Sequence, residues 1–128
     1  VINFNTEEVH YVNSDTEQLN RVFINLLKNS IESLKEKHQK TGNFKKKIDV
    51  EIQLINDYIS IVVQDNGTGF TNNDLKTLSK PYFTTKKEGS GLGLSIVEKI
   101  LNDHNGFIEF ISQKEGAKIK ILLPKYVN

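Results

Sequence analysis

The sequence predicts an α+β fold, a two-layer α/β sandwich in which helices cover one face of a mostly antiparallel sheet. Two observations support this prediction. Apolar residues recur at helical spacing in two segments, and they alternate with polar residues in four further segments. Helices and strands that are apolar on one side bury those sides against each other. The 128 residues, 37% of them apolar, suffice for one core, so we expect a single domain over residues 1–128.

The first half of the chain predicts one helix and one β-hairpin. Asp15 or Ser14 can cap a helix over residues 16–38, and we expect a loop over 35–47, which is polar and contains Gly42. The apolar side of this helix comprises Leu19, Val22, Phe23, Leu26, Leu27, Ile31 and Leu34. Residues 48–54 and 59–63 then alternate on either side of Asn56-Asp57, which is the pattern of a hairpin with one buried face.

The second half predicts another helix and two more strands. A short helix is possible at 72–78, and residues 80–88 follow neither period, so we expect a mobile loop there. A helix starts near Gly91 or Leu92 and ends in the polar segment 102–106. Strands follow at 107–111 and 117–123 around the Glu115-Gly116 turn, and Pro124 ends the pairing.

Composition excludes several classes of function. A net charge of +1 favours neither nucleic acid nor a membrane surface as partner, and we interpret Lys45-Lys46-Lys47 as a solvated turn. The absence of cysteine excludes disulfides and thiolate metal sites. No apolar stretch approaches the roughly 18 to 20 residues that cross a bilayer. The chain opens on Val1, so we expect a fragment of a longer protein.

Two asparagines on the first helix form a candidate ligand site. Asn25 and Asn29 are four residues apart and lie one above the other at the edge of the apolar stripe. An amide half-buried in a helix needs hydrogen-bond partners, and amide oxygens can bind a hard cation such as Mg²⁺. The alternative is a pair of solvated asparagines.

The segment Asp65-Asn-Gly-Thr-Gly69 follows the hairpin's second strand. A carboxylate at a strand end can accept a hydrogen bond from an exocyclic amine such as that of adenine, and Gly67 and Gly69 would let a ring lie against the backbone. A plain turn is the alternative, but the apolar strand expected after such a turn does not follow.

A third segment, Gly89-Ser90-Gly91-Leu92-Gly93-Leu94, leads directly into the second helix. Its backbone N–H groups and the positive end of that helix are suited to phosphate oxygens. It matches neither the Walker nor the dinucleotide pattern. Lys86 could add a mobile positive charge, whereas Lys87 is better interpreted as solvated. A flexible hinge before the helix is the alternative.

The order of these segments resembles the ATP-binding catalytic domain of two-component sensor histidine kinases, in the superfamily that includes gyrase and heat-shock protein 90. Residues 25–34 resemble its N box, 65–69 its G1 box, 81–86 its F box and 89–94 its G2 box. The lid residues 82–86 and the stretch 29–33 are most similar to the nitrogen-regulation type. Glu32 departs from many sensor kinases, which carry a basic residue there.

The resemblance implies a Bergerat ATP-binding fold with ATP and Mg²⁺ as cofactors. Asn29 would bind the metal, Asp65 the adenine amine and Asn25 the phosphates. The lid would supply Phe83 as an anchor, with Thr84, Thr85 and Lys86 near the phosphates. The superfamily's hydrolases typically carry a glutamate at the position of Asn25, and an amide cannot act as a general base, which favours phosphoryl transfer over hydrolysis.

The resemblance also defines the expected partners. A phosphoacceptor histidine normally lies on a separate dimerisation domain of the same protein, and His10, His38 and His104 lack that context, so we expect them to be structural or solvated. A response regulator would receive the phosphoryl group. The isolated domain would be a monomeric cytoplasmic part of a homodimeric, membrane-anchored parent. Two alternatives stay open: a stand-alone protein-serine kinase of the anti-sigma-factor type, and a non-catalytic nucleotide-sensing module.

Overall fold

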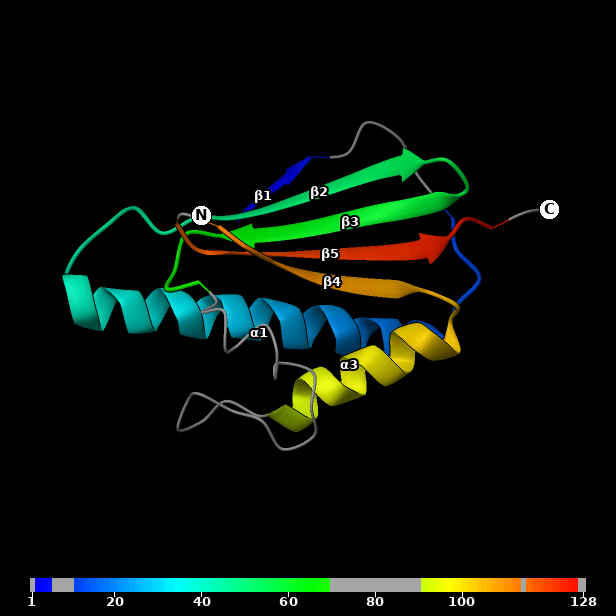
Figure 1. The fold of residues 1–128 in the computed structure, drawn as a ribbon, viewed down its shortest axis with the longest axis horizontal. Helices are drawn as coiled ribbons and strands as arrows, with labels where there is room; N and C mark the ends of the chain where they lie inside the picture. Colours follow the sequence, from blue (N-terminus) through cyan, green and yellow to red (C-terminus); the bar gives the residue numbers. More distant parts are fainter. Residues whose placement is uncertain (1, 6–10, 70–90, 114, 127–128) are drawn as a thin grey trace.

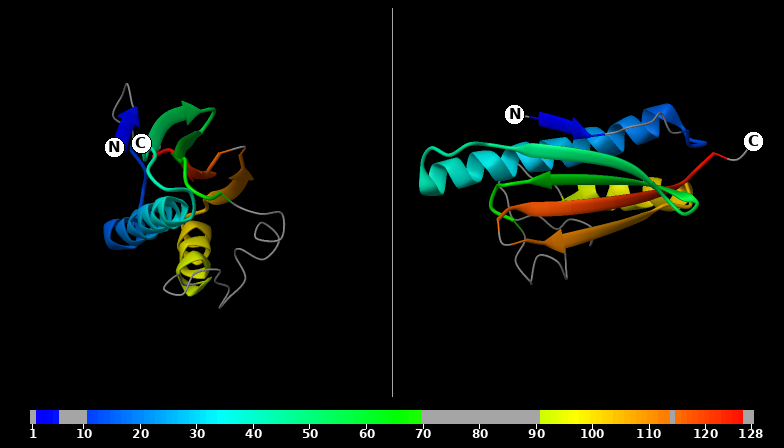
Figure 2. Two further views of the ribbon diagram at one scale, coloured as in Figure 1. Left: turned by 90° about the vertical axis from the view of Figure 1, so that its left-hand side faces the viewer. Right: turned by 90° about the horizontal axis from the view of Figure 1, so that it is seen from above.

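The computed structural model describes residues 2–5, 11–69, 91–113 and 115–126, which form two layers (Figure 1). Helices α1 and α3 lie together on one face of a five-stranded sheet, and the end-on view in Figure 2 separates the two layers. The elements in chain order are β1 (Ile2–Asn5), α1 (Thr16–Thr41), β2 (Ile48–Ile55), β3 (Tyr58–Asp65), α3 (Gly91–Asp103), β4 (Phe107–Ser112) and β5 (Ala117–Pro124). The predicted fold class is confirmed.

Helix α1 begins where the sequence predicts and ends later. Asp15 is its N-cap, and its side chain accepts a hydrogen bond from the backbone nitrogen of Gln18 at 3.2 Å. The expected loop over 35–47 is wrong for its first half, because the helix, which was expected to end near residue 38, continues to Thr41. Gly42, at φ 84°, ends the helix and donates its N–H to the His38 carbonyl. A glycine adopts this positive-φ conformation at little cost because it has no Cβ.

The sheet has the order β1-β2-β3-β5-β4. Its antiparallel part confirms the predicted hairpin, with Ile55 opposite Tyr58 across the turn and Asn56 at φ 55°. The last two strands are each one residue longer than expected, and Pro124 does not end the pairing, because it belongs to β5 and lies opposite Tyr58. Strand β1 was not predicted, and it pairs in parallel with β2, with Ile2 opposite Ile48.

The core lies between the helices and the inner face of the sheet. Val22 and Leu26 of α1, Val97 of α3 and Ile121 of β5 are fully buried. Ile31 was predicted to belong to the buried stripe of α1, but it is 40% exposed. Within the described residues, no helix combines the length and the apolar character that crossing a membrane requires.

His104 joins the end of α3 to the beginning of α1. Its Nδ1 donates to the carbonyl of Ile100 at 2.7 Å, and its Nε2 accepts the backbone N–H of Asp15 at 3.0 Å. The neutral imidazole satisfies both bonds with one tautomer. The sequence left His104 as either structural or solvated, and these two hydrogen bonds make its role structural.

Candidate functional site

The candidate site is centred on the turn that follows β3. Asp65, the last residue of the strand, is only 5% exposed, and its Oδ1 accepts the backbone N–H of Gly67 at 2.9 Å. The turn between β4 and β5 packs behind it, because a Cβ on Gly116 would overlap the backbone carbonyl of Asp65. Gly69 and Gly116 both adopt positive φ, at 78° and 87°. Backbone packing therefore holds the carboxylate in place.

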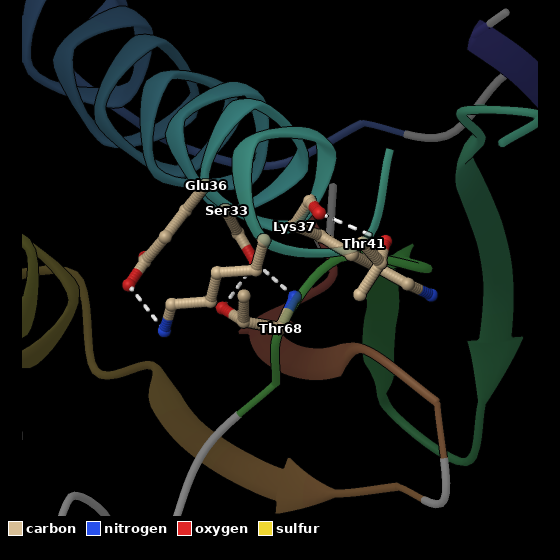
Figure 3. Close-up of polar contacts among 6 residues, drawn as sticks. Ser33, Glu36, Lys37, Thr41 and Thr68 are labelled. Carbon is tan, nitrogen blue, oxygen red and sulfur yellow. Dashed lines mark hydrogen bonds and ion pairs between the residues drawn. The ribbon is translucent and has the colours of Figure 1, made fainter. Parts of the chain in front are cut away.

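Helix α1 packs against the same turn through Ser33. The Ser33 hydroxyl accepts the backbone N–H of Thr68 at 3.0 Å and lies 3.2 Å from the Thr68 hydroxyl. Figure 3 shows the two side chains meeting between the helix and the turn. Gly67 has no room for a side chain, since a Cβ there would overlap the Ser33 side chain. Sequence reasoning missed Ser33, because only tertiary packing brings it to the turn.

A second set of contacts, also missed from the sequence, holds the outer side of the turn. The Asn66 carboxamide accepts the N–H of Lys47 at 2.8 Å and donates to the Lys45 carbonyl at 2.7 Å. Lys37 of α1 donates to the Asn66 carbonyl at 2.9 Å, and its ammonium lies 4.7 Å from the ring centre of Phe44. The basic run before β2 is thus an exposed connection that is bound to the turn.

The two asparagines lie on the side of α1 that leads to this turn. Asn25 and Asn29 are both half-buried, and they precede Ser33 at steps of four residues along the helix. Residues at that spacing occupy one face of a helix. Asn25, Asn29 and Ser33 therefore form a polar row that begins beside the core residues Val22 and Leu26 and ends at the turn.

The glycine-rich segment belongs to the other helix, α3. Gly91 begins α3, and the residues from Gly91 to Leu94 form its first turn, as predicted. Helix α3 ends beside the start of β4 (Figure 1). The remaining predicted contributors and the possible short helix at 72–78 lie outside the described residues; they are Phe83, Thr84, Thr85, Lys86, Gly89 and Ser90.

A family comparison decides the assignment. Residues 14–127 match the family described as histidine kinase-, DNA gyrase B-, and HSP90-like ATPase. The chain belongs to this family. The resemblance drawn from the four sequence boxes is thus confirmed. The matched range includes the Asp65 turn, the polar row on α1 and the start of α3.

Individual curated proteins are similar to this chain over most of its length. The chain is 38% identical over 118 residues to a putative sensor histidine kinase NtrY-like from Rickettsia conorii. It is 36% identical over 116 residues to sporulation kinase A from Bacillus subtilis. These alignments cover 91% and 90% of the chain but only 18% of each relative's length.

The fold agrees with solved structures of the same family. The catalytic domain of histidine kinase ThkA matches with a TM-score of 0.78 and 28% identity, over 97% of this chain and 76% of that one. The sensor histidine kinase MprB from mycobacteria matches with a TM-score of 0.76 and 25% identity.

Proposed function

We propose that this domain binds Mg-ATP and transfers the γ-phosphoryl group to a histidine on a separate dimerisation domain in two-component signal transduction. The observation that carries the proposal is the buried Asp65 carboxylate, which lies in a glycine turn packed on the same helix face as Asn25 and Asn29. Family membership and the kinase names of the relatives support the same conclusion.

Asp65 would recognise the base. One of its carboxylate oxygens accepts the Gly67 N–H, and that bond orients the group so that it can also accept from the exocyclic amine of adenine. Ser33 and the Gly116 carbonyl fill the space where side chains of Gly67 and Gly69 would lie, so these two glycines would contribute their backbone to the adenine site. We therefore assign Asp65, Gly67 and Gly69 to adenine binding.

Asn29 would hold the metal. The described residues contain no group of three or more His, Cys, Asp or Glu side chains that could bind an ion alone. A half-buried amide oxygen beside a phosphate site fits Mg²⁺, which usually takes few protein ligands and completes its coordination with water and phosphate oxygens. When bound, Mg²⁺ neutralises charge on the transferred phosphoryl group.

Asn25 and the glycine-rich segment would position the phosphates. Asn25 can donate to phosphate oxygens but cannot remove a proton from water, so the site favours transfer over hydrolysis. The start of α3 at Gly91 offers backbone N–H groups and the positive end of the helix dipole to the same oxygens. Further phosphate and lid contacts are proposed for Lys86 and for Phe83, Thr84, Thr85, Gly89, Ser90, Leu92, Gly93 and Leu94.

The chain spans 18% of the length of the NtrY-like kinase and of sporulation kinase A. The rest of the protein, its phosphoacceptor domain and its response regulator therefore belong to the proposal. We propose that residues 1–128 are the catalytic domain of a longer, homodimeric and membrane-anchored protein. That protein would supply the phosphoacceptor histidine and would pass the phosphoryl group to a response regulator. The isolated domain would be monomeric.

The test is a transfer assay in which the chain is mixed with the helical dimerisation domain of its parent protein and γ-labelled ATP. We expect Mg²⁺-dependent label on that domain, labile in acid and stable in base as phosphohistidine is, and no label with Asp65→Asn. Acid-stable label would indicate a serine kinase instead. ATP binding without any transfer would indicate a nucleotide-sensing module.

A further inference from the structure

The Ser33 hydroxyl has a defined hydrogen-bond direction. Ser33 is 7% exposed, and within the described part of the chain its polar partners are the backbone nitrogen and the hydroxyl oxygen of Thr68. A backbone nitrogen only donates, so Ser33 accepts there. Its own hydrogen must then go to Thr68 Oγ1, because a buried donor without an acceptor is costly.

This direction fixes the role of Thr68. Because Thr68 Oγ1 accepts from Ser33, the Thr68 hydroxyl hydrogen points away from Ser33. Thr68 is exposed, whereas its neighbour Gly67 is buried and bound to Asp65. The turn therefore offers an acceptor, the Asp65 carboxylate, and three residues later an outward-pointing donor, the Thr68 hydroxyl.

Resting on the proposed function, we propose that Ser33 is a positioning residue that makes Thr68 a hydrogen-bond donor to a ring nitrogen of the bound adenine. Adenine carries its amine between two acceptor nitrogens, N1 and N7. An acceptor for the amine beside a donor for a ring nitrogen matches this pattern. Guanine places a carbonyl oxygen where adenine has the amine, and that oxygen would face the carboxylate.

Calorimetric titration with ADP, 1-deaza-ADP and 7-deaza-ADP tests the assignment, because each analogue lacks one acceptor nitrogen. We expect the wild-type chain to bind one of the two analogues about three- to tenfold more weakly than ADP, as for one hydrogen bond. Thr68→Val should lower the affinity for ADP by a similar factor and leave the affinity for that analogue unchanged. Ser33→Ala should also reduce the discrimination, which is the ratio of the affinity for ADP to that for the weaker analogue, although Thr68 keeps its hydroxyl.

Two matched variants separate positioning from packing. Thr68→Ser keeps the hydroxyl and should retain wild-type affinity and discrimination. Ser30→Ala removes another buried serine of α1, three residues before Ser33, and should change neither. The inference would be overturned if Ser33→Ala and Thr68→Val left the ratios of ADP affinity to analogue affinity unchanged for both analogues. If those ratios are unchanged while Asp65→Asn still lowers the affinity for ADP, only this inference fails. If the wild-type chain does not bind ADP, the proposed function fails as well.

Discussion

Asp65 and Ser33 belong to different layers of the fold, yet they accept hydrogen bonds from two consecutive amides of one turn. Asp65 Oδ1 accepts from Gly67 at 2.9 Å and Ser33 Oγ accepts from Thr68 at 3.0 Å. The strand and the helix thus hold the turn from both sides. A change on α1 is therefore expected to reach the Asp65 carboxylate through the backbone, without any contact to the ligand.

Gly67→Ala tests how tightly helix and turn are packed. The added methyl would overlap Ser33, both its side chain and its backbone, so the turn must move. We expect a loss of about 1 to 3 kcal/mol in the free energy of unfolding, as for overpacked sites. We also expect at least about a tenfold loss of ADP affinity, because Asp65 loses its orienting bond. Urea unfolding and calorimetry measure the two effects; wild-type values for both would contradict the packing.

Gly116→Ala and Gly42→Ala form a matched pair, since both glycines have positive φ, at 87° and 84°. A Cβ on Gly42 would meet nothing within 4 Å, so this change should cost only the backbone strain, about 1 to 3 kcal/mol for a conformation at φ 84° and ψ -161° that is essentially confined to glycine. A Cβ on Gly116 would overlap the backbone of Asp65, so Gly116→Ala should cost more and should also weaken nucleotide binding. Equal unfolding free energies for the two variants would show that Gly116 does not support the site.

His104→Ala should lower the stability of the fold without affecting nucleotide binding. It removes the bonds to Asp15 and Ile100, which predicts a loss of about 1 to 2 kcal/mol in the free energy of unfolding. His104 lies near the start of α1, whereas the Asp65 turn contacts the helix at Ser33, so ADP affinity should stay at the wild-type value. The exposed Asn102→Ala, in the same region, serves as control. A selective loss of ADP affinity would be inconsistent with a structural role.

Asn29→Ala tests the metal assignment. Affinity for ADP measured with a chelator present should stay near the wild-type value, whereas the gain on adding Mg²⁺ should fall by about tenfold, as for the loss of a strong polar contact. Asn25→Ala, four residues earlier on the same helix, should keep the gain from Mg²⁺. An undiminished Mg²⁺ response in Asn29→Ala would remove Asn29 from the metal site.

Local signals in the sequence predicted most of the fold. The cap at Asp15, the Asn56-Asp57 turn and the helix start at Gly91 each depend on neighbouring residues, and all three are confirmed. Strand β1 has only four residues and pairs in parallel with a segment more than forty residues away, so no local pattern indicates it. The end of α1 was misjudged because its last turns are polar and resemble a loop.

The site was only partly predictable, because some of its contacts join residues that are far apart in the sequence. The Asp65 turn stands out because a carboxylate and two glycines follow a strand. The contact between Ser33 and Thr68 joins residues 35 positions apart, and it depends on how α1 crosses the sheet. A serine on a helix carries no sign of such a contact.

The most direct test of the account is calorimetric titration of the chain with ATP and ADP, with and without Mg²⁺, beside the same titrations of Asp65→Asn. We predict Mg²⁺-dependent binding of ATP by the wild-type chain and a loss of binding in the variant, because the amide presents a donor to the adenine amine. Equal affinity of the two proteins for ATP would contradict the assignment of Asp65 and, with it, the proposed site.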